Sequence, residues 1–183
     1  MMTGPRSMDG LHLRPVDPNQ DAEALSSIYG RYVREAWVSF EVIPPPPEAM
    51  QERAQAILEK QLPYVVAENS DGRLLGYAYA SPYRARAAYQ YSVENSIYLA
   101  PEAQGRGVAK ALMDEVVKRC KDRELKTMIA VVGLDPNVPT DQNQSVRFHL
   151  KYGFKSIGVL ENIGHKFGQW TGTAVLQLDL STP

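Results

Sequence analysis

The stretch Gln104-Gly105-Arg106-Gly107-Val108-Ala109 stands between a segment of alternating apolar and polar residues and an amphipathic helical pattern. Glycines there let the backbone approach a ligand, and the N–H groups of a helix's first turn point outward at its positive end. Together they suit a pyrophosphate, and the Arg106 guanidinium can add a charge-assisted contact. The alternative is a flexible strand–helix turn without a ligand. The stretch is not a P-loop, because no Gly-Lys-Ser/Thr follows, and it lacks the three-glycine spacing of the dinucleotide fingerprint.

Apolar periodicity on both sides of this stretch predicts a succession of strands and helices. The expected strands cover about 11–14, 64–68, 74–80, 93–99, 126–132, 154–160 and 175–180. The expected helices cover about 19–33, 47–62, 104–123 and 141–152, and Asn19 or Asp21 is the expected cap of the first. Between the first two helices, Pro44–Pro47 form a stiff connector. This order predicts a mixed α/β fold.

The composition is that of a folded domain. The 183 residues are 44% hydrophobic and 22% charged, with a formal net charge of −1, which excludes collagen-like, disulfide-scaffold and wholly disordered chains. A pI near 6.3 argues against nucleic acid and membrane as partners. We expect residues 1–10 to be a disordered N-terminal segment and residues 11–183 to form a single domain. With the lone Cys120 and no secretory or membrane-spanning pattern, we expect a cytoplasmic protein.

The hexapeptide at 104–109 fits the pattern Gln/Arg-x-x-Gly-x-Gly/Ala, and in this it resembles the GCN5-related N-acetyltransferases, the GNAT superfamily. The order of expected elements is similar too. The resemblance implies a mixed, mostly antiparallel central sheet of about six to seven strands flanked by about four helices. It also implies that the residues from Gln104 to Ala109 hold the pyrophosphate of acetyl-CoA, which would be a co-substrate.

Four further segments resemble the phosphinothricin and methionine sulfoximine acetyltransferases within that superfamily. They are Val38–Glu41, Ser81–Tyr89, Ser92–Tyr98 and Gly164–Trp170. The subgroup implies direct acetyl transfer to the α-amine of a small amino acid or analogue. Phosphinothricin, methionine sulfoximine and methionine sulfone are the acceptors that it implies.

Acetyl transfer to an amine needs a proton acceptor and a stabilised oxyanion. The resemblance puts the family's general base on Glu94, at the start of the central strand, and a glutamate in water or in a salt bridge is the alternative. A partly apolar site would raise the pKa of Glu94 and suit it to this role. The expected oxyanion donors are the backbone amides of Ile97, Tyr98 and Leu99, where the superfamily's strand bulges.

His149 lies four residues before Gly153-Phe154, where many superfamily members have a tyrosine that protonates the leaving thiolate. We expect His149 to be that acid or a substrate-positioning group, and a histidine hydrogen-bonded on its helix is the alternative. The family's pantetheine-binding asparagine falls on Gln142, with Asn143 next to it. Either Gln142 takes its place, or the preceding loop, which is longer than usual, shifts Asn143 into position. We expect Asn143, with Ser145, to contact the pantetheine arm.

Arg84 and Arg86 lie just before the catalytic strand. Residues i and i+2 of an extended segment point the same way, so both guanidinium groups can converge on a carboxylate or phosphinate. A solvated basic loop is the alternative. We expect Phe40 and Tyr89 to wall the same substrate pocket, although aromatic side chains more often belong to the core.

No cluster has the spacing of metal ligands, so we expect no metal, and we assign structural roles to Lys166 and Trp170. The family resemblance implies a homodimer. Two other functions stay open, namely acetylation of a protein, peptide or polyamine amine, and coenzyme binding without catalysis. A polyamine would favour an acidic pocket, against which Arg84 and Arg86 argue, and Glu94 argues against lost catalysis.

Overall fold

The computed structural model describes residues 10–181, so the predicted disordered segment lies outside the described residues except for Gly10. The described chain divides into two compact units. Unit 1 contains residues 10–28, Pro46–Ala80 and Ser96–Cys120, and unit 2 contains Tyr29–Pro45, Ser81–Asn95 and 121–181.

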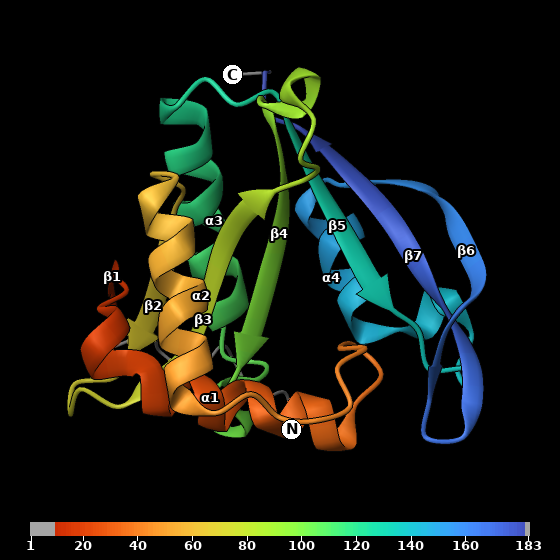
Figure 1. Cartoon of the computed structure of the whole chain (residues 1–183), viewed down its shortest axis with the longest axis horizontal. Coiled ribbons are helices and arrows are strands. Elements are labelled where there is room, and N and C mark those ends of the chain that lie inside the picture. Colours follow the sequence, from red (N-terminus) through yellow and green to blue (C-terminus); the bar gives the residue numbers. More distant parts are fainter. Residues whose placement is uncertain (1–9, 182–183) are drawn as a thin grey trace, which may run out of the picture. The chain divides into compact units, whose positions relative to one another are not determined.

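Residues 10–181 contain four α-helices and seven strands (Figure 1). The helices are α1 (Pro18–Glu35), α2 (Pro47–Glu59), α3 (Val108–Asp122) and α4 (Gln144–Tyr152). The strands are β1 (His12–Pro15), β2 (Tyr64–Glu68), β3 (Leu74–Pro82), β4 (Ser92–Leu99), β5 (Thr127–Gly133), β6 (Lys155–Lys166) and β7 (Gln169–Asp179). Three short 3₁₀ turns, η1 (Ala87–Tyr89), η2 (Pro101–Ala103) and η3 (Thr140–Gln142), precede β4, α3 and α4. The predicted mixed α/β fold is confirmed.

Hydrogen bonds join the strands in the order β1-β2-β3-β4-β5-β7-β6. In unit 1, β2 pairs antiparallel with both β1 and β3, and Tyr64 lies opposite Tyr79. In unit 2, the start of β4 runs parallel to β5, whereas β7 pairs antiparallel with β5 and with β6. The parallel β4–β5 pair stands beside antiparallel pairs, which agrees with the predicted, mostly antiparallel sheet.

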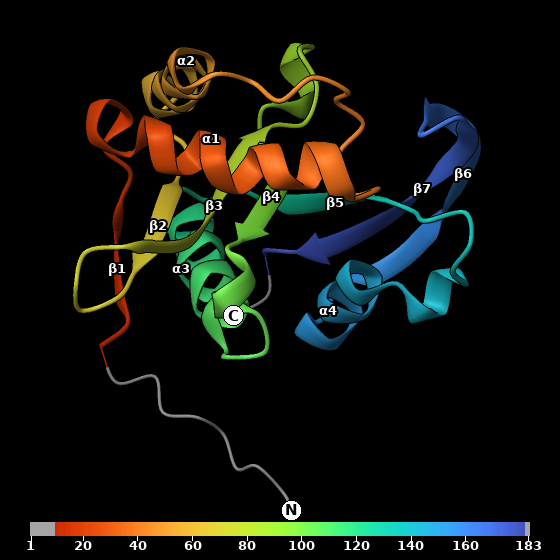
Figure 2. The same ribbon diagram turned by 90° about the horizontal axis from the view of Figure 1, so that it is seen from below.

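Each unit buries its own apolar residues. In unit 1, α2 and α3 cover opposite faces of β2 and β3 (Figure 2), and the fully buried side chains include Leu25, Val65, Val66, Tyr77, Leu112, Met113 and Val116. In unit 2, α4 packs against β5 and β7, and the buried side chains include Val33, Val93, Met128 and Leu176. Burying one such large side chain stabilises a fold by about 1.5–3 kcal/mol.

The first helix is capped by Asp17, and the predicted caps Asn19 and Asp21 were wrong. The Asp17 Oδ1 atom accepts hydrogen bonds from the backbone nitrogens of Asn19 at 2.9 Å and Gln20 at 3.2 Å. Pro18 then takes the first helical position, where a missing N–H has no consequence.

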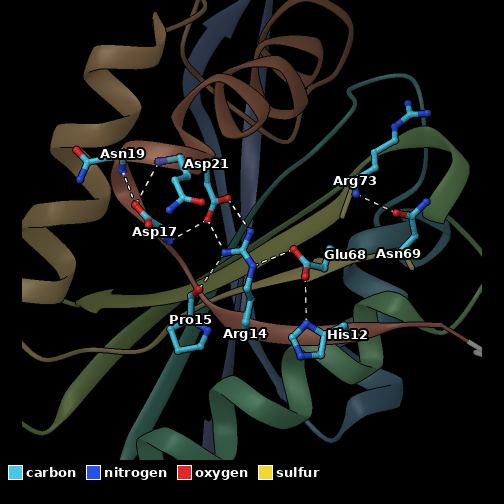
Figure 3. Close-up of polar contacts among 10 residues, drawn as sticks. His12, Arg14, Pro15, Asp17, Asn19, Asp21, Glu68, Asn69 and Arg73 are labelled. Carbon is cyan, nitrogen blue, oxygen red and sulfur yellow. Dashed lines mark hydrogen bonds and ion pairs between the residues drawn. The ribbon is translucent and has the colours of Figure 1, made fainter. Parts of the chain in front are cut away.

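Asp21 belongs instead to a polar network that joins β1 to α1 and β2 (Figure 3). Arg14 donates two hydrogen bonds of 2.8 Å to the Asp21 carboxylate and a third of 2.8 Å to Glu68. His12 lies 3.1 Å from the same Glu68 carboxylate. Burial raises the pKa of Glu68, but the hydrogen bonds from Arg14 and His12 outweigh it, so the pKa lies below its usual value.

The third helix begins at Val108, four residues later than predicted. Gly105 and Gly107 have φ angles of +70° and +83°, and a right-handed helix cannot pass through that region. The last helix also begins later, at Gln144, because a 3₁₀ turn takes up Thr140–Gln142.

The final hairpin is longer than predicted, and strands β6 and β7 take up much of the stretch expected as a loop. Phe167 and Gly168 join them with φ angles of +50° and +77°, and positive φ at both positions is what a two-residue type I′ turn requires. The glycines of this region, Gly164, Gly168 and Gly172, interrupt the alternation by which strands are recognised.

Candidate functional site

The predicted pyrophosphate loop lies in unit 1 and is exposed from Gln104 to Gly107. A Cβ at Gly105 would meet nothing within 4 Å, so its positive φ alone favours glycine. The helix's i→i−4 bonding starts with Ala111 N to Gly107 O at 3.1 Å, and the amides of Val108–Lys110 precede it. Since the first turn of α3 has no acidic residue, the loop fits a pyrophosphate.

Arg106, in the middle of this loop, is exposed, and its guanidinium lies 3.5 Å from the Glu102 carbonyl oxygen. That contact is at the outer limit of hydrogen bonding, so it holds the side chain only weakly. The Arg106 guanidinium can therefore turn toward an anion.

The predicted oxyanion donors, Ile97–Leu99, form the last part of β4. A Cβ on Gly76 of β3 would lie 2.7 Å from the Tyr98 carbonyl oxygen, so glycine is required for this close strand approach. The parallel pairing of β4 with β5 covers Ser92–Glu94 and Thr127–Ile129. Ile97–Leu99 therefore follow the part of β4 that pairs with β5.

The predicted general base, Glu94, lies in unit 2 opposite Ile129 of β5. Its side chain is half-buried, and burial raises its pKa above the usual 4.5. A carboxylate of raised pKa holds a transferred proton better near neutral pH than an exposed one does. Glu94 thus has the electrostatic character that a general base needs.

His149 lies buried in unit 2, with both ring nitrogens engaged. Its Nδ1 is 2.7 Å from the Ser145 carbonyl oxygen, and its Nε2 is 3.2 Å from the Asn95 side-chain nitrogen. Because a carbonyl only accepts, Nδ1 carries the proton, and the Asn95 amide donates to Nε2. Burial lowers the pKa of His149, and the hydrogen bond to Ser145 opposes this only in part. The ring is therefore held neutral.

Asn95 was missed in the sequence, although it follows Glu94 directly. Successive strand residues point to opposite faces, so Asn95 points away from the Glu94 side, and it is only 7% exposed. A polar residue inside a strand was the available signal. Its partner His149 stands 54 positions away, and no local pattern indicates that pairing.

Asn143 caps α4. Its Oδ1 accepts hydrogen bonds from the backbone nitrogens of Ser145 at 3.0 Å and Val146 at 3.1 Å, and its Nδ2 donates to the Gly133 carbonyl at 3.4 Å. Gln142, the alternative to Asn143, is exposed at the end of η3. Asn143 thus holds the first turn of α4 against the end of β5.

Arg84 and Arg86 are both exposed in a bend between β3 and η1. Because the chain bends here, the alternation of a straight strand, which predicted one direction for both side chains, does not apply. Arg84 instead lies over the Tyr83 ring, 5.3 Å from its centroid, and contact with Tyr83 raises the pKa of Arg84. Tyr89 meets the edge of Tyr83 at 5.7 Å.

Phe40 lies between two glycines of unit 2. Added Cβ atoms would lie 2.3 Å from the Phe40 ring at Gly164 and 3.2 Å from it at Gly133. The ring is nevertheless 37% exposed. Phe40 is therefore held on one side and open on the other, as the wall of a pocket would be.

A cavity of about 580 Å³ opens in unit 2. It is lined by the β5–α4 loop, from Leu134 to Thr140, and by facing residues of β6 and β7. None of the predicted site residues lines it. Across residues 10–181, no three His, Cys, Asp or Glu side chains are grouped as metal ligands, and no helix is long and apolar enough to cross a membrane.

The predicted site residues divide between the two units. The residues predicted for the amine acceptor and for proton transfer lie in unit 2: Phe40, Arg84, Arg86, Tyr89, Glu94 and His149. Asn143 and Ser145 lie there as well, whereas Ile97–Leu99 and the 104–109 loop lie in unit 1. The chain passes from one set to the other within β4, between Asn95 and Ser96.

The fold and the glycine loop define a class of proteins. A family model described as Acetyltransferase (GNAT) family matches residues 30–154. The chain therefore belongs to this family.

Within the family, a phosphinothricin N-acetyltransferase of Alcaligenes faecalis is 40% identical over 163 residues, which cover 89% of this chain and 80% of that protein. An L-methionine sulfoximine/L-methionine sulfone acetyltransferase of Pseudomonas paraeruginosa is 28% identical over 118 residues, 64% of this chain and 65% of that one. A GNAT superfamily phosphinothricin acetyltransferase from Sinorhizobium meliloti, solved in complex with acetyl-CoA, superposes with a TM-score of 0.85 at 37% identity, covering 93% of this chain and 88% of that one. The chain is accordingly an acetyl-CoA-dependent N-acetyltransferase similar to the phosphinothricin acetyltransferases, as its sequence predicts.

Proposed function

We propose that this protein acetylates the α-amine of a small amino acid or analogue, of the type of phosphinothricin, methionine sulfoximine or methionine sulfone. The observation that carries the proposal is Glu94, a half-buried carboxylate of raised pKa. It stands in a chain 40% identical to a phosphinothricin N-acetyltransferase.

Bound acetyl-CoA supplies an activated acetyl thioester. The loop from Gln104 to Ala109 holds its pyrophosphate through backbone N–H groups, and Arg106 adds a positive charge. Asn143 serves the pantetheine arm by fixing the first turn of α4, because its carboxamide is already engaged in the cap. Ser145 lies in that first turn, and we assign it the contact with the pantetheine arm.

The chemistry rests on two groups of β4. Glu94 accepts a proton from the acceptor's amine, which leaves the nitrogen lone pair available for attack. The backbone N–H groups of Ile97–Leu99 donate to the oxyanion that develops. The C–N bond forms as the C–S bond breaks, and the coenzyme's thiolate leaves and takes a proton from water. The raised pKa of Glu94 supports the first role.

The neutral His149 supports the positioning role rather than that of an acid. Its Nδ1–H donates a hydrogen bond to the Ser145 carbonyl, and its Nε2 accepts one from the Asn95 side chain. His149 therefore serves by fixing α4 to the strand that carries Glu94. The acceptor's carboxylate is assigned to Arg84 or Arg86, and its side chain to a pocket walled by Phe40 and Tyr89.

We also propose that the protein is a cytoplasmic homodimer. Strand β6 lies at the end of the strand order and exposes large apolar side chains, namely Ile157, Val159, Leu160 and Ile163. Exposed apolar patches of this kind mark interfaces. The molar mass in solution from light scattering tests this: a 20.4 kDa species contradicts the dimer.

The function is tested by following thiol release from acetyl-CoA with a panel of amines. The panel contains phosphinothricin, methionine sulfoximine, methionine sulfone, ordinary amino acids, polyamines and short peptides. We expect selective turnover of the first three. The Glu94→Gln variant controls for acetyl-CoA hydrolysis in the same assay.

Other outcomes select the alternatives. Turnover of peptides or polyamines alone would replace the amino-acid acceptor with a larger amine. Binding of acetyl-CoA by calorimetry without turnover of any amine would support a coenzyme-binding module.

A further inference from the structure

We propose that Lys166 is a positioning residue for the acceptor site, holding the segment Ala36–Glu41 and through it Phe40. This inference rests on the proposed function, in which Phe40 walls the acceptor pocket. Lys166 lies at the tip of the β6–β7 hairpin, and sequence alone gave it only a structural role.

The Lys166 ammonium is buried and holds the segment by its backbone. The side chain is 3% exposed, and Nζ donates hydrogen bonds to the Ala36 carbonyl at 2.7 Å and the Ser39 carbonyl at 2.5 Å. These two carbonyls flank the turn that leads into Phe40. Contact with both carbonyls fixes the conformation of the turn as well as its distance from the hairpin.

A closed ring of hydrogen bonds also holds the same segment. The Glu41 backbone nitrogen donates to Ser39 Oγ at 3.2 Å, and Tyr29 Oη donates to Glu41 Oε1 at 2.9 Å. Because the Tyr29 proton is used on Glu41, the 2.8 Å contact between Ser39 Oγ and Tyr29 Oη is donated by Ser39. Hydrogen bonds thus hold both residues next to Phe40 in the chain, Ser39 and Glu41.

The hairpin turn keeps Lys166 in place. Phe167 has a φ of +50°, a strained conformation for a bulky residue that surrounding contacts must maintain. Its ring meets Trp37 edge-on at 5.1 Å and lies 4.8 Å from Lys166 Nζ. The turn therefore grips the Ala36–Glu41 segment through Trp37 as well as through Lys166.

Burying the charge of a lysine at this position costs desolvation free energy, and a residue that only filled space would avoid that cost. Burial lowers the pKa of Lys166, and only Glu41 opposes it. An apolar side chain would pack a hairpin tip at less cost, whereas two carbonyl groups in fixed positions need a donor. The charge is therefore retained for the geometry it imposes on the segment that presents Phe40.

The test is the Lys166→Met variant, which keeps an unbranched side chain only one atom shorter and removes its donors. We expect the KM for the amino-acid acceptor to rise at least about ten-fold, while the KM for acetyl-CoA changes less than about two-fold. Lys155→Met is the matched control, since Lys155 is an exposed residue of the same strand, and we expect it to leave both constants unchanged.

A double-mutant cycle with Phe40→Ala separates positioning from general loss of stability. If Lys166 acts through Phe40, the Lys166→Met change adds little to the acceptor KM of the Phe40→Ala variant. Fully additive effects would overturn the proposal. So would a Lys166→Met protein with a lower melting temperature and unchanged acceptor KM.

Hydrogen–deuterium exchange keeps this inference separate from the proposed function. In Lys166→Met, amides of residues 36–41 should exchange faster, and those of 84–90 should not, whatever the enzyme acetylates. Unchanged exchange at 36–41 overturns the positioning role. Faster exchange in a protein that acetylates no amino acid would support the role of Lys166 in holding residues 36–41. It would contradict the proposal that the acceptor is an amino acid.

Discussion

The Asn95 side-chain amide donates a hydrogen bond of 3.2 Å to Nε2 of His149, next to the proposed base Glu94. Both side chains are buried, at 7% and 3% exposure. The bond joins the helix α4 to the strand that carries Glu94, and its acceptor is the imidazole nitrogen that carries no proton, since Nδ1 donates to the Ser145 carbonyl.

Replacing Asn95 by Leu should destabilise the protein by about 1–3 kcal/mol, because His149 Nε2 loses its donor in a buried place. Urea denaturation measures the loss. The double variant Asn95→Leu/His149→Leu should recover part of it, since it removes the His149 Nε2 acceptor that the single variant leaves without a donor. Equal losses in the single and double variants would contradict the pairing.

The depressed pKa of His149 makes stability fall on acidification. The unfolded chain binds a proton near the usual value of 6.5 while the folded protein does so only at lower pH, so stability is lost as the pH falls below that value. We expect the free energy of unfolding to drop progressively as the pH falls through 6.5. In the His149→Gln variant, the free energy of unfolding should depend less on pH. Substitution of the exposed His165 by Gln is the control and should leave the pH dependence unchanged.

Removing the Glu94 carboxylate should lower kcat/KM by about 10²–10⁴-fold and leave acetyl-CoA affinity within about two-fold. Because burial raises the pKa of Glu94 above 4.5, the wild-type rate should fall on the acid side above that value. Glu94→Gln should lose this limb of the profile. An exposed control, Glu124→Gln, should change neither quantity, and a retained acid limb in Glu94→Gln would remove Glu94 as the base.

Two glycines form a matched pair for testing the coenzyme loop. Gly105 and Gly72 have φ angles of +70° and +77°, and a Cβ on either would meet nothing within 4 Å. Alanine at either position should therefore cost a similar amount, about 1–2 kcal/mol. Only Gly105→Ala should weaken acetyl-CoA binding, by about ten-fold or more in calorimetry, because its methyl group meets the pyrophosphate. Equal affinities in the two variants would contradict the loop assignment.

Arg14→Met should cost about 3 kcal/mol, because it leaves the carboxylate of Asp21 buried without its guanidinium. Asp21 is only 3% exposed. The exposed i,i+4 pair of Arg31 with Glu35 provides the control, and Arg31→Met should cost less than about 0.5 kcal/mol. Denaturation of the two variants at one pH decides whether the network in Figure 3 stabilises the fold.

Local sequence patterns were sufficient to predict the fold and to nominate much of the candidate site. The two-glycine stretch at 104–109 and the alternation around Glu94 are each formed by consecutive residues, so each can be recognised from the sequence alone. The Asp-Gly turn before Leu74 likewise gave the β2–β3 hairpin with its correct position.

Features built from distant residues could not be read in the same way. Lys166 reaches Ala36 across 130 positions, and neither residue has a local pattern that names the other. The bend at Arg84–Arg86 also escaped prediction, because an extended segment and an irregular one of the same composition look alike in sequence. The full length of the β6–β7 hairpin was not predicted, because its glycines interrupt the apolar–polar alternation of the strands.

The β5–α4 loop is closed at its base by hydrogen bonds that do not involve its tip. Asn143 Nδ2 donates to the Gly133 carbonyl at 3.4 Å, and Leu134 N donates to the Gly172 carbonyl at 3.0 Å. The tip can therefore gain or lose residues without moving His149, since each doubling of a flexible loop costs only about 0.6 kcal/mol. An epitope or fluorescent label grafted between Pro136 and Pro139 should therefore leave catalysis intact.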